Sequence, residues 1–145
     1  MPEKAGWDRY LSLLSSKGRG VVATLKADGR PQLSNVDFCY NAESRLVRLS
    51  TTDGRAKVRN LHRDPRVSLH LSTPDLSSYA VYEGVAEISE VAAKPDDTTV
   101  AELIDVFREV QGEHPDWNEY RAAMVADRRL VVRFHIDYAY GWIRP

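Results

Sequence analysis

The sequence contains only one cysteine, Cys39, among its 145 residues. A single cysteine excludes an internal disulfide and any metal site that is built from several thiolates. His70 lies in an alternating apolar stretch and has no second ligand at the spacing that metal sites use. We therefore expect no metal centre, and the shortage of cysteine agrees with a reducing, cytoplasmic setting.

Long apolar segments are also absent from the sequence. No run approaches the roughly 20 residues that a membrane-spanning helix requires. The first residues, Met1–Lys4, lack the apolar stretch of a secretory signal. We therefore expect neither a membrane partner nor secretion.

Two nucleotide-binding signatures are missing as well. No Gly-rich dinucleotide fingerprint follows a predicted strand, and the sequence contains no Walker pattern. A doubly wound parallel sheet is therefore not expected. Hydrophobic residues make up 43% and charged residues 28% of the chain, as in ordinary globular domains. Because there is no internal repeat or linker, residues 1–145 are predicted to form a single domain.

The net charge of -1 conceals an uneven distribution of charged residues. Residues 75–119 carry twelve acidic and two basic side chains, whereas residues 55–66 carry five basic side chains and one acidic one. The basic segment is therefore local, and nucleic-acid binding requires a broad basic face. We expect a small anionic ligand and no nucleic-acid partner.

Residues 51–63 combine a strand end, a glycine turn and a short helix. Val58 and Leu61 are three residues apart and lie on one helical face. Arg55 and Lys57 stand at the start of this helix, where the helix dipole disfavours cations. A bound anion, most simply a phosphate, would offset that conflict. A short solvated basic helix is the alternative interpretation.

Hydrophobic periodicity predicts six strands and four helices. The strands cover residues 21–25, 32–40, 46–49, 66–71, 79–88 and 130–136. The helices cover residues 7–16, a short stretch after Arg55, the segment between Asp97 and Gly112, and a segment after Asp116. Short glycine turns such as Asp28-Gly29 imply antiparallel pairing. The predicted class is mainly β with α (α+β): a small closed or split barrel of six antiparallel strands, flanked by helices.

Three local features of these elements suggest more specific contacts. Gly84, inside the strand 79–88, suggests a bulge or the close approach of another backbone. The aromatic tail Tyr138–Trp142 is expected to pack on the core or on a partner chain. Three polar residues interrupt the strand 32–40, and they form either a half-exposed face or hydrogen-bond partners for a ligand: Gln32, Ser34 and Asn35.

Short segments spread over most of the chain carry a family resemblance through their order and spacing. They are Val22–Leu25 with Asp28–Pro31, Gln32–Asn35, Arg55–Leu61, Asp64–Arg66, Tyr79–Gly84 and Asp127–Arg129. With these segments the chain resembles the pyridoxamine 5'-phosphate oxidase-like FMN-binding split-barrel family. Within that family it is similar to the class of F420-dependent oxidoreductases, which use a deazaflavin cofactor.

The resemblance implies a split-barrel homodimer with two cofactor sites at the dimer interface. By similarity, Arg55 and Lys57 hold the cofactor phosphate. Further residues of the same subunit line the ring and ribityl region or lie near it: Gln32, Ser34, Asn35, Ser50, Thr51 and Ala56. The second subunit would contribute Ser77, Ser78, Tyr79 and Arg129. Relatives often carry a Trp just before the Ser-Tyr-Ala run, where this chain has Ser77.

The activity that the resemblance implies is a reductase that transfers a hydride from the reduced deazaflavin to a small-molecule substrate. The cofactor supplies this chemistry, so no catalytic side chain is assigned. An FMN-dependent oxidase or reductase on the same barrel and a non-catalytic carrier or sensor of F420 are the alternatives. The deazaflavin carries a phosphodiester and an oligoglutamate tail, whereas FMN ends in one phosphate. A line of cations suits the longer anion: Arg55, Lys57 and Arg59, with Lys26 and Arg30 from the neighbouring hairpin.

Overall fold

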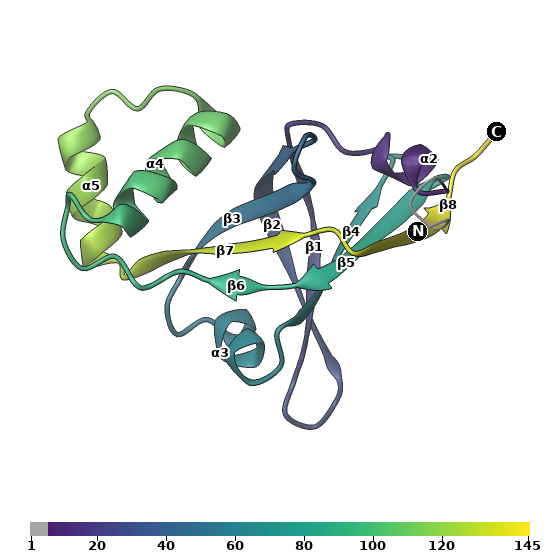
Figure 1. Cartoon of the computed structure of the whole chain (residues 1–145), viewed down its shortest axis with the longest axis horizontal. Coiled ribbons are helices and arrows are strands. Elements are labelled where there is room, and N and C mark those ends of the chain that lie inside the picture. Colours follow the sequence, from purple (N-terminus) through teal and green to yellow (C-terminus); the bar gives the residue numbers. More distant parts are fainter. Residues whose placement is uncertain (1–5) are drawn as a thin grey trace.

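A computed structural model of the chain describes residues 6–145 (Figure 1). The prediction about Met1–Lys4 lies outside these residues. Eight strands form one antiparallel sheet in the order β6-β7-β3-β2-β1-β4-β5-β8. The strands are β1 (Lys17–Leu25), β2 (Pro31–Asn41), β3 (Leu46–Thr52), β4 (Arg66–Ser72), β5 (Tyr79–Val85), β6 (Glu87–Ile88), β7 (Arg129–His135) and β8 (Tyr138–Trp142). The helices are α2 (Asp8–Leu11), α3 (Ala56–Arg63), α4 (Thr98–Gln111) and α5 (Trp117–Ala126). None of the helices in this described range is long and apolar enough to cross a membrane.

The sheet curls into a split barrel because β5 and β7 approach each other at Gly84. A Cβ atom built on Gly84 would overlap the carbonyl oxygen of His135 and lie 2.7 Å from the Phe134 ring. Beside this contact, the Asp137 N–H donates to the Glu83 carbonyl at 2.8 Å. The predicted close approach of another backbone at Gly84 is confirmed, and so is the mainly antiparallel split barrel with flanking helices.

The strand count differs from the predicted six. The predicted strand 79–88 is divided at Ala86, whose N–H donates to the Pro65 carbonyl at 2.8 Å. Beyond this break, β6 pairs with β7, whereas β5 pairs with β4 and β8. The aromatic tail forms the additional strand β8, in which Trp142 is opposite Tyr79. The tail therefore packs on its own chain through backbone pairing.

The N-terminal helix is shorter than the predicted span 7–16. α2 is a single turn, and β1 already begins at Lys17. Gly18 and Gly20 lie inside β1. A Cβ atom on Gly20 would lie 2.8 Å from the His70 carbonyl oxygen. Gly20 therefore allows β4 to pack closely against β1. The pairing of β1 with β2 along its whole length, from Lys17 to Leu25, outweighs the local helical pattern.

The barrel interior holds the main apolar core. Val47 and Leu49 of β3 are buried there, as the two-residue period of a strand requires. α3 covers one end of the barrel through Val58 and Leu61, both buried on the predicted face. Trp7, beside α2, packs into the same core. The interior is therefore filled by side chains and leaves ligand binding to other surfaces.

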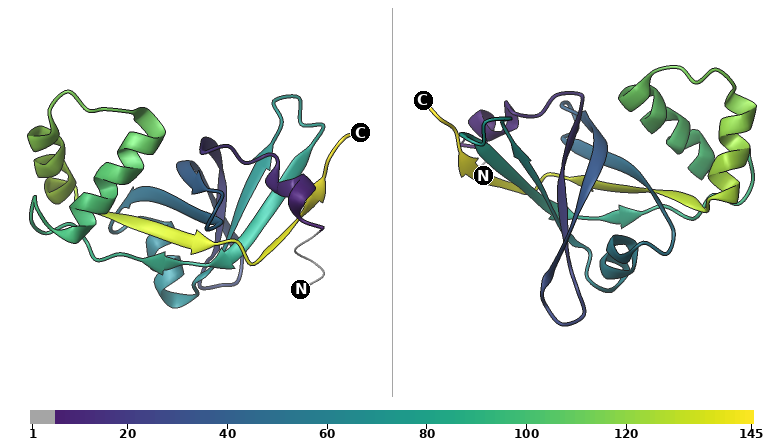
Figure 2. Two further views of the ribbon diagram at one scale, coloured as in Figure 1. Left: turned by 45° about the horizontal axis from the view of Figure 1, so that its top comes forward. Right: turned by 180° about the vertical axis from the view of Figure 1, so that it is seen from behind.

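α4 and α5 form a separate pair on the outer face of the sheet, at one side of the molecule (Figure 2). Leu103 and Ile104 of α4 join Tyr120 of α5 and Val131 of β7 in a second apolar cluster. The Asp97 carboxylate accepts a hydrogen bond from the Val100 N–H at 2.8 Å, so the predicted helix start at Asp97 is confirmed. The pair thereby stands over β3 and β7.

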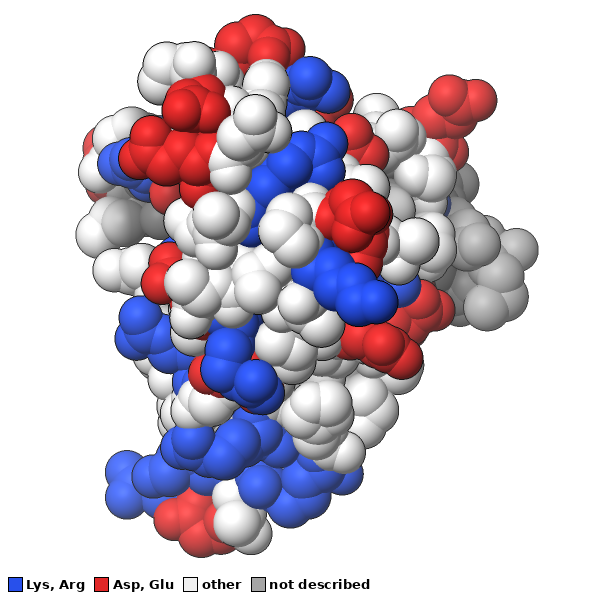
Figure 3. All heavy atoms as spheres, turned by 90° about the vertical axis from the view of Figure 1, so that its left-hand side faces the viewer, with Lys and Arg blue, Asp and Glu red and all other residues white. Residues whose placement is uncertain are grey.

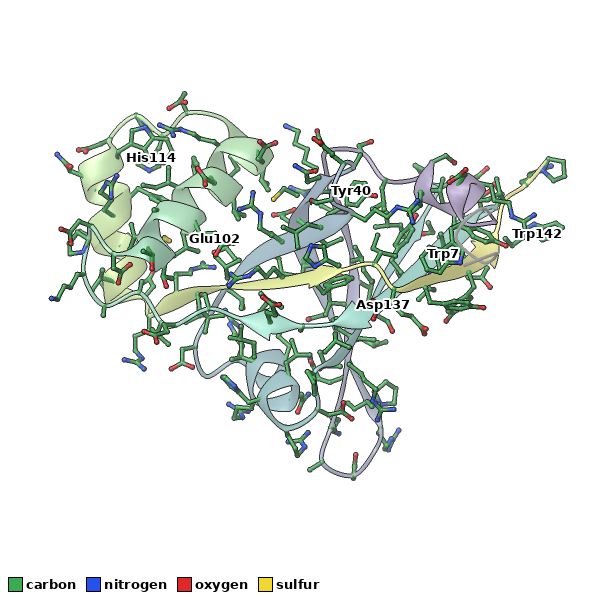
Figure 4. All side chains as sticks on the ribbon, in the orientation of Figure 1. Trp7, Tyr40, Glu102, His114, Asp137 and Trp142 are labelled. Atoms are coloured by element: carbon green, nitrogen blue, oxygen red, sulfur yellow. The ribbon has the colours of Figure 1, made fainter. Side chains whose placement is uncertain are left out.

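Glu102 fastens α4 to the sheet. Its carboxylate lies 2.6 Å from the Arg133 guanidinium and 3.5 Å from that of Arg48 (Figure 4). Arg48 and Arg133 are opposite each other on β3 and β7. One carboxylate therefore bridges two outward-facing arginines and fixes the position of the helix over the outer face.

Candidate functional site

A pocket of about 330 Å³ lies between the outer face of the sheet and the α4–α5 pair. Its polar wall comes from β2, β3, β7 and the first turn of α3, and contains Asn35, Asp37, Ser50, Lys57 and Arg129. Its apolar wall comes from α4 and α5, and contains Val106, Phe107, Val110, Tyr120 and Met124. The pocket therefore offers cations and hydrogen-bonding groups on one side and an apolar surface on the other.

Arg129 and Ser50 lie side by side on the sheet. Arg129 of β7 is opposite Thr52, and Ser50 of β3 is opposite Val131, so both side chains project from the outer face. Nη1 of Arg129 lies 3.4 Å from Oγ of Ser50. Nε of Arg129 is buried without a hydrogen-bond partner among residues 6–145. A buried donor without a partner costs about 1–3 kcal/mol, so this atom marks a place where a ligand oxygen can accept.

Lys57 brings a second cation to the same wall. Burial lowers the pKa of Lys57, and the charges of Arg55 and Arg129 lower it further. The first turn of α3 contains no acidic residue. Asp53, in the preceding turn, is paired with Arg128 at 2.8 Å, a contact that lowers the pKa of the Asp53 carboxyl. A bound anion would therefore supply the counter-charge that the cations lack.

The start of α3 adds backbone donors to these cations. The backbone of Arg55 is extended (φ −63°, ψ 148°), and its side chain makes no capping hydrogen bond. The first turn therefore keeps N–H groups that a ligand can use. The Arg59 guanidinium donates to the Gly54 carbonyl and holds the turn in place. This geometry supports an anion site over a merely solvated basic helix.

Four of the predicted cofactor-binding residues line one pocket: Asn35, Ser50, Lys57 and Arg129. Arg55 and Ala56 directly precede Lys57 on the chain but are not part of the lining. The resemblance places Arg129 in the second subunit, whereas the structure places it in the pocket of its own chain.

Gln32, Ser34 and Thr51 occupy the opposite face of the strands that carry Asn35 and Ser50, because successive residues of a strand alternate between faces. The Gln32 carboxamide oxygen accepts from the Thr24 hydroxyl at 3.4 Å. Oγ of Ser34 is buried and has no hydrogen-bond partner in the described part of the chain. Thr51 is buried. The structure does not bring these three residues into the pocket.

Ser77, Ser78 and Tyr79 lie at the β4–β5 connection, outside the pocket lining. The Ser77 hydroxyl donates to the Asp75 carboxylate at 2.8 Å. Ser78 is buried, and its Oγ accepts from the Arg144 N–H at 2.8 Å. Tyr79 is partly exposed on the outer face of β5. Within one chain, these residues are not brought together with the cations.

Sequence reasoning missed the apolar wall of the pocket. The helical spacing of Phe107, Tyr120 and Met124 indicates a buried face, but not that part of this face borders a cavity. The rings of Phe107 and Tyr120 lie 4.9 Å apart. The Tyr120 hydroxyl donates to the Leu103 carbonyl at 3.0 Å, and burial raises the pKa of Tyr120 to about 12. Tyr120 is therefore a fixed, neutral part of the wall.

The part of the chain that the structure describes contains no group of three or more His, Cys, Asp or Glu side chains able to hold a metal ion. Burial raises the pKa of the Cys39 thiol, so this cysteine is not prepared to act as a nucleophile. The pocket is thus equipped to bind and orient a ligand that combines an anionic group with an apolar body.

Known proteins resemble this chain in sequence and in fold. The family model described as pyridoxamine 5'-phosphate oxidase matches residues 7–143. The F420H(2)-dependent biliverdin reductase of Mycobacterium tuberculosis (strain CDC 1551 / Oshkosh) is 25% identical over 134 residues, which cover 92% of this chain and 86% of that protein. A solved structure named F420 Reductase has a TM-score of 0.66 at 26% identity, and covers 90% of this chain and 95% of the other. A conserved hypothetical protein from Mycobacterium tuberculosis has a TM-score of 0.67 at 24% identity over 96% of this chain and 83% of its own, which shows the shared fold.

These relatives support an oxidoreductase class and the binding of a flavin or a deazaflavin. The family model covers almost all of the described residues, and the split barrel with its cationic pocket fits that match. The chain therefore belongs to the pyridoxamine 5'-phosphate oxidase family.

Proposed function

We propose that this protein is an F420-dependent oxidoreductase that reduces a small organic acceptor. The observation that carries the proposal is the pair of cations at the pocket, Lys57 and Arg129, of which Arg129 keeps a buried donor without a partner in residues 6–145. A phosphate oxygen is a strong acceptor for such groups. The printed names of two relatives, an F420H(2)-dependent biliverdin reductase and an F420 Reductase, add support.

When bound, the reduced deazaflavin supplies the hydride that the acceptor receives. Lys57, Arg55 and the free N–H groups of α3 would hold its phosphate. Ser50 and Asn35 offer hydrogen-bonding groups to the ring and ribityl region beside that phosphate. The apolar wall of α4 and α5 would exclude water from this side of the pocket.

The charge distribution favours the deazaflavin over FMN. Figure 3 shows Lys and Arg side chains gathered at one end of the molecule, over the β1–β2 hairpin and α3. The exposed cations of these two elements are Lys26, Arg30, Arg55, Arg59 and Arg63. FMN ends in a single phosphate that Lys57 and Arg55 could already neutralise. The additional cations suit a ligand whose anionic groups continue along the surface, as an oligoglutamate tail does.

A side-by-side titration with F420 and FMN, followed by ring fluorescence, tests this proposal. We expect tighter binding of F420, and oxidation of the reduced cofactor by members of a panel of quinones, enones and tetrapyrroles. Protein that purifies yellow and retains FMN against excess F420 would support the FMN-dependent alternative. Tight F420 binding without turnover across the panel would indicate a carrier or sensor.

The proposal includes a homodimer formed through the outer face of β5 and β8. Tyr138, Tyr140 and Trp142 are 45%, 40% and 60% exposed on this face. Exposed aromatic rings in a row mark an interaction surface, and Figure 4 shows Trp142 at the end of the molecule away from α4 and α5. A second copy of the chain is the proposed occupant, because Ser77–Tyr79 border this face and the resemblance assigns them to the other subunit's cofactor site.

Sedimentation of Tyr140→Glu tests the dimer. We expect wild-type protein to sediment as a dimer, and Tyr140→Glu to shift toward the monomer and to bind F420 more weakly. Ala122→Glu, on the exposed side of α5, is the matched control and should remain dimeric. A wild-type monomer with full F420 affinity would contradict the dimer without affecting the cofactor assignment.

A further inference from the structure

The cofactor pocket continues into a second hollow. This hollow has a volume of about 510 Å³ and shares Asp37, Val110 and Gln111 with the pocket. Its other lining residues belong to the start of β1: Lys17, Gly18 and Arg19. The two spaces together form one groove that runs along β1 and β2 beneath the C-terminal end of α4. We name it the β1–β2 groove.

The strand register places the two ends of the groove relative to each other. Val21 is opposite Asn35, Arg19 is opposite Asp37, and Lys17 is opposite Cys39. Residues of one strand face repeat roughly every 7 Å. Arg19 therefore lies about 7 Å, and Lys17 about 14 Å, along the sheet from the level of Asn35 in the cofactor pocket.

Within residues 6–145, both cations at the far end retain unused donors. Lys17 Nζ donates to the Val110 carbonyl at 3.3 Å, a neutral partner that does not balance its charge. Arg19 uses Nε to contact the Asp37 carboxylate at 2.8 Å, with 88% of the Arg19 side chain and 49% of the Asp37 side chain exposed. Ion pairs this exposed contribute little to stability, so the guanidinium can also bind a ligand. The three side chains together carry one net positive charge.

We infer that the β1–β2 groove binds the acceptor, and that Lys17 and Arg19 recognise a carboxylate placed about 7–14 Å from its reducible end. This inference rests on the proposed function, because it takes the cations Lys57 and Arg129 as the cofactor end of the groove. The acceptor is therefore an elongated organic anion. An uncharged quinone would use the apolar wall but gain nothing from the two cations.

The test compares para-carboxychalcone, an enone with a distant carboxylate, with its methyl ester. In the Lys17→Gln/Arg19→Gln variant, KM for the acid should rise about tenfold or more, as expected for loss of a charge-assisted hydrogen bond. KM for the ester, kcat and the affinity for F420 should not change. Asp37→Asn should lower KM for the acid, because it removes the competing carboxylate. Lys94→Gln, an exposed lysine before α4, is the control and should behave as wild type.

Calorimetry with the dihydro form of para-carboxychalcone, which cannot be reduced further at the former enone, and with the methyl ester of this dihydro form provides a readout that does not depend on turnover. Wild-type protein should bind the acid more tightly than the ester, and the double variant should lose this preference. Equal affinities in wild type, or an unchanged preference in the double variant, would overturn the inference. If the acid binds through Lys17 and Arg19 but F420 does not bind, the anion groove stands and the proposed function fails. If F420 is turned over with equal KM for acid and ester, the proposed function stands and the groove assignment fails.

Discussion

The two faces of the sheet differ in what fills them, and β3 shows the contrast within one strand. Val47 and Leu49 point into the barrel and are fully surrounded by apolar side chains. Arg48 and Ser50 point outward, where Arg48 is held by Glu102 and Ser50 lines the pocket. One face is closed by packing, whereas the other keeps polar groups available. Stability should therefore depend on the inner face and ligand affinity on the outer face.

The same contrast appears in α3, which contributes to both regions. Val58 and Leu61 are buried in the barrel core. Lys57, one residue from Val58, lines the pocket. Substitutions at neighbouring positions of one helix should thus separate folding from binding, and the following predictions use this separation.

The largest effect is expected for Val58→Asp. The side chain of Val58 is 1% exposed, and a carboxylate there would be buried without a cation partner. We expect a loss of about 4 kcal/mol or more in the free energy of unfolding, measured by chemical denaturation. Val58→Ala should lose about half as much, because it only leaves a cavity. A Val58→Asp protein as stable as wild type would show that α3 does not seal the barrel.

Gly84→Ala tests the closure of the barrel itself. The new Cβ atom would overlap the His135 carbonyl oxygen and crowd the Phe134 ring. Overpacking of this kind costs about 1–3 kcal/mol in stability, which thermal and urea unfolding can measure. Gly18→Ala is the comparison, since its Cβ atom would lie 3.0 Å from the Phe38 ring, a milder contact. A smaller loss for Gly84→Ala than for Gly18→Ala would argue against the tight approach of β5 and β7.

Lys57→Ala should change binding and leave folding nearly intact. Burial and neighbouring positive charges already lower the pKa of Lys57, so its removal relieves repulsion in the free protein. Loss of one charged hydrogen bond should weaken F420 binding by about 1.5–3 kcal/mol, roughly ten- to a hundredfold. Arg66→Ala removes a cation that is paired with Asp64 outside the pocket, and should not affect the titration. Equal affinities of Lys57→Ala and wild type would contradict the phosphate site.

The inner face was largely predictable from the sequence because burial imposes a period. The alternation in β3 and β4 and the spacing of Val58 and Leu61 follow directly from apolar side chains facing the core. The basic start of α3 was predictable for a different reason, since cations at a helix N-terminus conflict with the dipole. The close approach at Gly84 was also predictable, because a glycine within a strand often marks a place where another backbone comes near.

Non-local contacts account for what the sequence did not reveal. The extension of β1 back to Lys17 depends on its register with β2, and the break at Ala86 depends on the Pro65 carbonyl. The apolar pocket wall arises where Phe107 and Met124 extend beyond the core that they help to form. A helical pattern identifies which face of a helix is buried, but not the point at which neighbouring side chains stop covering that face. The position of Arg129 beside Ser50 likewise follows from strand pairing and not from sequence spacing.

The smallest effect is expected where a cation already has its partner. Asp64 and Arg66 form an exposed ion pair at 2.7 Å, and hydrogen bonds from Arg66 lower the pKa of Asp64 to about 2. Because the folded-state pKa lies below the unfolded value of about 3.9, the pair stabilises the protein above that value, and the contribution is lost as pH falls through about 2.

Asp64→Asn should therefore be slightly less stable than wild type at neutral pH, and the two proteins should converge between about pH 4 and pH 2. Urea unfolding across this range measures the difference. A difference that persists at the acid end would mean that Asp64 acts through its shape at the end of α3 and not through its charge. Convergence would show that Asp64 acts through its charge, in contrast to Lys57, whose pKa is lowered by burial and by neighbouring positive charges.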